Sequence, residues 1–134
     1  MLGGGNPVGG QNPTGVGSVL NYIGEHAYLY TGGVTNDGTN ETTLAEFTTA
    51  GNSYIVGAWQ PGYVDNSTQD FEFRLYFNNQ VVASIVLTSA RDYSPYEEID
   101  IIIPTDTKVK ITAKNLSSSD AVQTSANITG RVYQ

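Results

Sequence analysis

The sequence contains no cysteine, so disulfides do not support its fold. Cations are scarce as well: six Lys and Arg stand against 13 Asp and Glu, and the formal net charge is −7. This balance disfavours nucleic-acid binding, which depends on Lys and Arg neutralising phosphates. The single histidine, His26, lacks the partners that a catalytic triad or a zinc site requires, and it fits a packing or surface residue better. We therefore expect a protein that is not an enzyme.

Long apolar runs are also missing. No run approaches the roughly 20 residues that a membrane-spanning helix needs. The start of the chain has neither the basic region nor the apolar region of a signal peptide. We therefore expect no membrane span and no signal peptide, in a chain whose 134 residues are the size of one domain.

The first 17 residues differ in composition from the rest. They are rich in Gly, Asn and Pro and contain no charged residue, which is typical of a flexible, extended arm. The sequence predicts an arm over 1–17 and a single folded domain over 18–134. Without Lys or Arg, the arm is suited to contact protein rather than nucleic acid. Its candidate partner-binding residues are Leu2, Val8, Pro13 and Val16.

After residue 18, helix signals are weak. Val, Ile, Thr, Tyr and Phe dominate, and turn residues recur at short intervals, which indicates an all-β sandwich or barrel. The sequence predicts eight strands, the first of which can extend back through residues 18–23. These strands are 26–31, 42–49, 53–60, 70–77, 81–88, 99–104, 107–114 and 125–133.

One segment admits two structures. In residues 42–49, Thr43 and Glu46 have the spacing of a helix capping box, and Leu44 and Phe47 have a helical spacing. A strand with a β-bulge fits equally well, and the threonines favour the strand.

The segments 70–77 and 81–88 read as a hairpin. Phe71 and the alternate residues that follow it are apolar, while their neighbours are polar or charged. A two-residue loop would place the apolar set of 81–88, which begins at Val81, on the charged face. The parity therefore predicts a three-residue loop over 78–80, with an Asn in the left-handed conformation.

Eight strands suit two four-stranded sheets, as in an antiparallel jelly roll. In that topology most consecutive strands lie in opposite sheets, and the hairpin above supplies a neighbouring pair. An immunoglobulin-like sandwich is the alternative, because Trp59 on the third strand matches the core Trp of that fold.

Four stretches carry a resemblance in architecture: the Gly/Asn/Pro arm, "FRLYFNNQVVASIVL", "IDIIIPTDTKVKI" and the terminal "ITGRVYQ". With its arm and its eight-stranded domain, the chain resembles the single jelly-roll capsid and minor-capsid proteins of viruses and phages. The resemblance covers the whole chain but includes no signature motif. It implies a subunit located in the virion, as a coat, cement or vertex protein. Its partners would be other coat subunits, including copies of itself.

The loop aromatics Tyr63, Tyr93 and Tyr96 are further candidates for partner binding, because Tyr is enriched at protein interfaces. Together with Trp59 they also fit the stacking platform of a carbohydrate-binding module, which is the alternative function. Trp59 lies on a strand that is apolar on both faces, however, so we expect it in the core.

Acidic and oxygen-rich segments offer little further chemistry. Glu97, Glu98 and Asp100 are adjacent acids that could pair as in a glycosidase, but solvated acids at a strand edge explain them better. The loops 36–41 and 65–70 contain the oxygen ligands that calcium takes, yet neither has EF-hand spacing, and ordinary turn chemistry accounts for both. We expect no cofactor and no metal.

Overall fold

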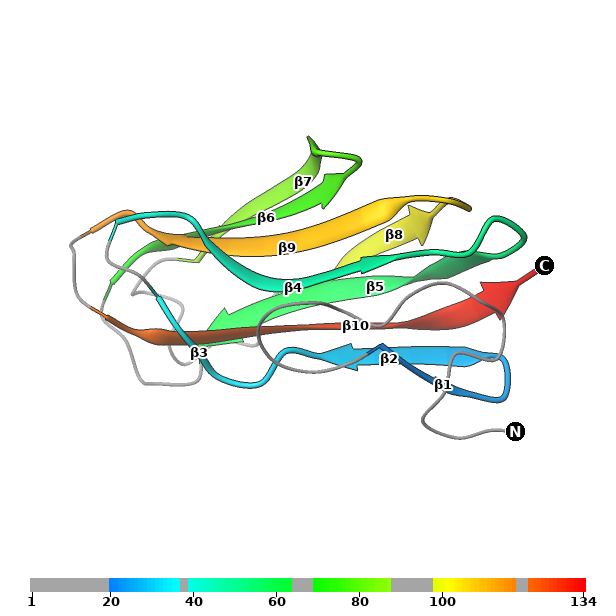
Figure 1. Cartoon of the computed structure of the whole chain (residues 1–134). Helices are drawn as coiled ribbons and strands as arrows, with labels where there is room; N and C mark the ends of the chain where they lie inside the picture. Colours follow the sequence, from blue (N-terminus) through cyan, green and yellow to red (C-terminus); the bar gives the residue numbers. More distant parts are fainter. Residues whose placement is uncertain (1–19, 37–38, 64–68, 88–97, 118–120) are drawn as a thin grey trace.

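The computed structural model describes residues 20–36, 39–63, 69–87, 98–117 and 121–134, which form an all-β structure (Figure 1). Each of the eight predicted strands is present, and two short strands, β1 and β3, are added to them. The strands are β1 (Asn21–Ile23), β2 (His26–Tyr30), β3 (Val34–Thr35), β4 (Thr42–Thr48), β5 (Tyr54–Tyr63), β6 (Phe71–Phe77), β7 (Gln80–Leu87), β8 (Ile99–Ile103), β9 (Lys108–Asn115) and β10 (Gln123–Tyr133).

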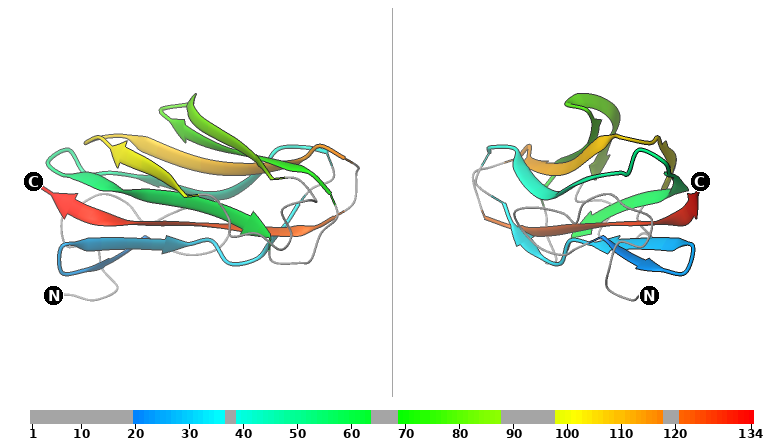
Figure 2. Two further views of the ribbon diagram at one scale, coloured as in Figure 1. Left: turned by 180° about the vertical axis from the view of Figure 1, so that it is seen from behind. Right: turned by 45° about the vertical axis from the view of Figure 1, so that its right-hand side comes forward.

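The strands form two antiparallel sheets that lie face to face (Figures 1 and 2). The six-stranded sheet has the order β1-β2-β10-β5-β8, with β3 also paired to β10. The four-stranded sheet has the order β4-β9-β6-β7. Leaving aside the short β3, each step along the chain from β2 to β10 changes sheet, except the step from β6 to β7. The sequence predicted two sheets of four strands each. One sheet has six strands instead, because β1 and β3 both join it.

The core lies between the sheets and follows from the alternation of the strands. One set of alternate residues in each long strand points inward, because successive side chains of a strand point to opposite faces. Trp59 is fully buried, as its strand predicts. The other largest buried side chains are Leu20, Leu29, Leu44, Ile55, Phe71, Phe73, Leu75, Leu87, Ile103, Ile111 and Ile128.

Residues 42–49 form a strand and not a helix. In β4, Thr43 pairs with Thr112 and Ala45 pairs with Ile111, so Leu44 is the extra residue of a β-bulge. The bulge lets Leu44 and Ala45 both be buried although they are adjacent in sequence. This confirms the prediction of a bulged strand.

The predicted three-residue loop between β6 and β7 is wrong. Phe77 pairs with Gln80, which leaves a two-residue turn of Asn78 and Asn79. Both residues have positive φ, 52° and 68°, as the mirror-image turns of hairpins require. A β-bulge instead turns the apolar residues of β7 back to the core. Leu75 pairs with Ala83 and Tyr76 pairs with Val81, so Val82 is the extra residue of the bulge.

That bulge decides which side chains of β7 reach the core. Ile85 and Leu87 are buried there and Ala83 is partly buried, as predicted, but Val81 is exposed. Val81 lies on the turn side of the bulge, where it pairs with Tyr76. The expected left-handed Asn is confirmed, and it occurs twice.

The turn gives a first testable prediction. Asn79→Gly should raise the free energy of unfolding by about 0.5 kcal/mol, because glycine adopts positive φ without a steric cost and Asn-Gly suits this turn best. Asn78→Gly should not stabilise the domain in the same way, because the Asn78 Oδ1 accepts a hydrogen bond from the Lys108 backbone amide at 2.9 Å. Urea unfolding of the two variants measures the difference. Equal midpoints would contradict this account of the turn.

Candidate functional site

Of the predicted partner-binding residues, Tyr63 alone lies within the described part of the chain. Leu2, Val8, Pro13, Val16, Tyr93 and Tyr96 lie outside the residues that it describes. Tyr63 is the last residue of β5, where its backbone pairs with Thr124. A surface for partners must therefore be sought among other residues.

The remaining candidates from the sequence are placed as follows. His26 is exposed on β2, with its ring 6.5 Å from that of Tyr28. Glu98 and Asp100 are exposed at the start of β8, and Glu97 lies outside the described residues, as do parts of both oxygen-rich loops. Within the described ranges, no three His, Asp or Glu side chains are grouped so that they could hold a metal ion. The same part of the chain has no helix long and apolar enough to cross a membrane.

The outer face of the six-stranded sheet carries an ordered array of side chains. The strand register places Tyr30, Asn127 and Gln60 side by side in one row across β2, β10 and β5. The next row holds Tyr28, Thr129, Ala58 and Asp100. The row after that holds His26, Arg131, Val56 and Ile102. The array thus changes from aromatic and polar at one end to charged and aliphatic towards the other.

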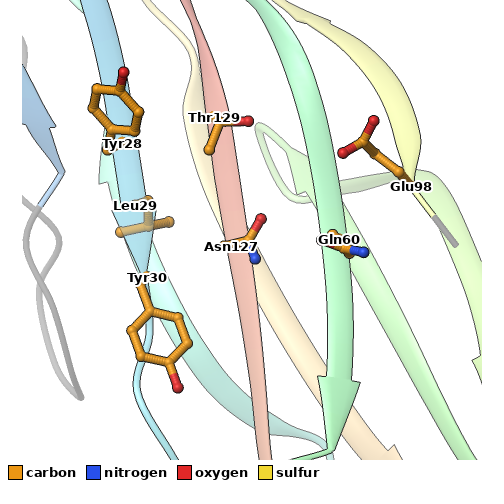
Figure 3. A pocket seen from close by; sticks show the side chains of 7 residues that line it. All are labelled: Tyr28, Leu29, Tyr30, Gln60, Glu98, Asn127 and Thr129. Carbon is orange, nitrogen blue, oxygen red and sulfur yellow. The ribbon is translucent and has the colours of Figure 1, made fainter. Parts of the chain in front are cut away.

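Five residues of the first two rows line a shallow groove of about 470 Å³, together with Leu29 and Glu98 (Figure 3). Tyr28 and Tyr30 on β2 form one side, and Glu98 next to β8 stands on the other, with β10 and β5 between them. Tyr28 is 42% exposed and Tyr30 55%, so their ring faces are accessible. Gln60, Asn127 and Thr129 complete the lining with groups that donate and accept hydrogen bonds.

A second, more apolar hollow of about 570 Å³ lies on the same sheet, lined by residues of β5 and β8 that include Val56, Asp100 and Ile102. It adjoins the side of the sandwich where β8 ends one sheet and β7 ends the other (Figures 1 and 2). β7 contains no charged residue and β8 contains only Asp100. We call this side the β7–β8 edge; its exposed aliphatic side chains are Val81, Val82, Val86 and Ile102.

The outer face of the four-stranded sheet is different, because charged groups pair across it. Arg74 lies 3.0 Å from a carboxylate oxygen of Glu72 and 3.7 Å from one of Glu41. Tyr76 and Thr112 donate hydrogen bonds to the same carboxylate oxygen of Glu41. Ser84 on β7 donates a hydrogen bond to Glu72. These contacts satisfy one another, so this face is better suited to stability than to ligand binding.

The network lowers the pKa of both carboxyl groups. Partial burial raises the Glu41 pKa, but the hydrogen bonds from Thr112 and Tyr76 and the charge of Arg74 together outweigh it. At Glu72, the hydrogen bond from Arg74 is the main cause of the lowered pKa. A lowered pKa in the folded state stabilises the fold above the unfolded-state pKa of about 4.5, and this stability is lost as pH falls through the folded-state pKa.

We therefore expect the free energy of unfolding to decrease as pH falls from about 5 to 3. Glu72→Gln should make this decrease shallower, because the variant has one fewer carboxyl group that titrates differently in the two states. Glu98→Gln is the matched control, since Glu98 is exposed and has no contact with Arg74 in the structure. Urea unfolding at several pH values tests this, and an equally shallow decrease in both variants would contradict it.

The segment "HAYLYT" carries a signal for the groove in the sequence itself. In "HAYLYT", Ala27 and Leu29 face the core, so Tyr28 and Tyr30 must face outward. Two large aromatic side chains on the solvent side of one strand indicate a binding surface. Their neighbours Asn127 and Gln60, however, come from strands far away in sequence, and only the pairing of β10 with β2 and β5 brings the three strands together.

No family model, no curated protein and no solved structure matches this chain. Function must therefore be inferred from the arrangement of the described residues.

Proposed function

We propose that the domain is a jelly roll and that it serves as a non-enzymatic structural subunit of a virus or phage particle. The strand order is the observation that carries this proposal. With β2 counted as first and β10 as eighth, the long strands of one sheet are the first, eighth, third and sixth. Those of the other sheet are the second, seventh, fourth and fifth. This alternation between sheets is what a rolled-up pair of Greek keys produces.

The immunoglobulin-like alternative fits the strand order less well. In that fold several consecutive strands are neighbours within one sheet. Among the described strands from β4 to β10, only β6 and β7 are consecutive neighbours. The buried Trp59, which suggested this alternative, is equally compatible with the core of a jelly roll.

The β7–β8 edge supports an assembling role. An edge strand offers unpaired backbone groups, and monomeric proteins usually protect such strands with charge, proline or a covering segment. β7 has no charged residue, and β8 presents Ile102 with 62% of its surface exposed. We propose that neighbouring subunits associate at this edge and that the arm strengthens the assembly, because several weak contacts together can hold a shell.

Light scattering behind size exclusion tests this proposal on the full chain and on a version that starts at Ser18. We expect the full chain to form an oligomer and the shortened chain to dissociate more readily. Circular dichroism of both versions checks that they are folded. A full chain that stays monomeric at the highest soluble concentration would contradict the proposal that copies of this chain associate.

A further inference from the structure

The groove on the six-stranded sheet has the features of a ligand site rather than of a plain strand surface. Its lining comes from four strands or their ends, β2, β10, β5 and the start of β8 (Figure 3). Tyr30, Asn127 and Gln60 occupy consecutive places in one row of the register. Adjacent strands lie about 4.8 Å apart, so the groove is about 14 Å wide from β2 to β8. At this width the groove is open enough for an extended ligand and too open to enclose a small one.

The charges around the groove limit what it can bind. Among the residues that the structure describes, no Lys, Arg or His lines it, and Glu98 is its one charged lining residue. Asp100 shares a row with Tyr28 and Thr129, and Arg131 in the next row forms an ion pair with Glu25 at 2.6 Å. A phosphate, a sulfate or an acidic sugar would be repelled by the carboxylate of Glu98 there. The ligand is therefore expected to be neutral.

The uncharged lining groups suit a polyhydroxylated ligand. The rings of Tyr28 and Tyr30 offer apolar faces against which the C–H face of a sugar ring can pack. The side-chain amides of Gln60 and Asn127 each donate and accept hydrogen bonds, as vicinal hydroxyl groups do. The Glu98 carboxylate accepts hydrogen bonds from hydroxyl groups without requiring a positive charge on the ligand.

We propose that this groove binds a neutral hexose oligosaccharide, with sugar rings packed on Tyr28 and Tyr30 and hydroxyl groups bonded to Asn127 and Gln60. The site differs from a carbohydrate platform of loop aromatics, because its aromatic residues lie on a strand. The proposal does not rest on the assembling role, which uses the exposed side chains of the β7–β8 edge. A subunit with both surfaces would attach a particle to a glycan-coated surface.

The test is titration of the isotope-labelled full chain with three neutral probes, maltohexaose, cellohexaose and mannohexaose, followed by backbone amide NMR shifts. We expect saturable binding of at least one probe, with the largest shifts in β2 and the facing part of β10. Trigalacturonic acid, an acidic oligosaccharide, should bind at least about tenfold more weakly because of Glu98 and Asp100.

Two substitutions make the test specific. Tyr30→Ala should weaken binding of the neutral probe at least about tenfold, because it removes one stacking surface. Asn127→Ala is the second variant, and it should weaken binding through the loss of hydrogen bonds. Tyr54→Ala is the matched control: Tyr54 is an exposed tyrosine on the same sheet face, but it stacks on Tyr133 outside the groove. A cooperative thermal unfolding transition in each variant would verify that it is folded.

Three results would overturn the proposal. The first is that none of the three neutral probes binds saturably. The second is that both groove variants bind as the unchanged protein does, or that the Tyr54→Ala control loses as much affinity as they do. The third is a preference for the acidic probe. The assembling role is tested separately, by light scattering. Failure of glycan binding would therefore not contradict it.

Discussion

Gly57→Ala should leave the domain barely folded. Gly57 on β5 lies directly opposite Gly130 on β10, in the middle of the longest strand pair. A Cβ added to Gly57 would lie 2.0 Å from the carbonyl oxygen of Thr129. No side chain can rotate away to relieve this contact, because the obstacle is backbone. The strands would have to separate at their centre, and we expect a loss of about 3 kcal/mol or more in the free energy of unfolding.

The melting temperature measures this loss. For a domain of this size, about 3 kcal/mol corresponds to a decrease of more than about 10 °C, and poor yield of folded protein is the extreme outcome. Gly51→Ala is the control, since a Cβ there meets nothing within 4 Å. This second change should leave stability within about 0.5 kcal/mol of the original. If Gly57→Ala had the same melting temperature as the Gly51→Ala control, the close approach of β5 and β10 would not be tight in solution.

Local pattern was sufficient to predict most of the fold. Alternation of apolar and polar residues placed every long strand within a few residues, because burial of one sheet face imposes a period of two. The same reasoning showed that a two-residue loop alone would point the apolar residues of β7 away from the core, so an extra residue is needed in the hairpin of β6 and β7. It could not tell a three-residue loop from a two-residue turn with a bulge, since both return Ile85 and Leu87 to the core. Two asparagines in sequence favour the turn, because each tolerates positive φ.

The candidate sites were harder to predict for a physical reason. The groove needs Tyr30, Asn127 and Gln60 in one row, and no local pattern fixes which strands become neighbours. The same holds for the contact between Gly57 and Gly130, which depends on the exact register of β5 and β10. Individual residues carried part of the signal, but the rows exist only once the strand order is known.

Charge introduced at the β7–β8 edge should weaken the self-association that we propose for this domain. We expect Ile102→Lys and Val86→Lys each to weaken self-association at least about tenfold, because a lysine at an edge strand opposes further strand pairing and must lose its hydration in an interface. Light scattering across a concentration series measures the association constant. Both positions are well exposed, Ile102 at 62% and Val86 at 44%, so a lysine at either should cost the monomer little folding stability.

The surroundings of these two positions separate assembly from folding. Val86 pairs across the strands with Glu72, so a lysine there gains an opposite charge within the same subunit. Ile102 lies two residues from Asp100 on the same face of β8, which has a similar effect. Thermal stability of the monomer should therefore change little. The matched control is Ile23→Lys, because Ile23 is 66% exposed on β1 at the opposite edge of the same sheet. If this control dissociated the oligomer while the two edge variants did not, subunits would associate through β1 and the proposed role of the β7–β8 edge would be wrong.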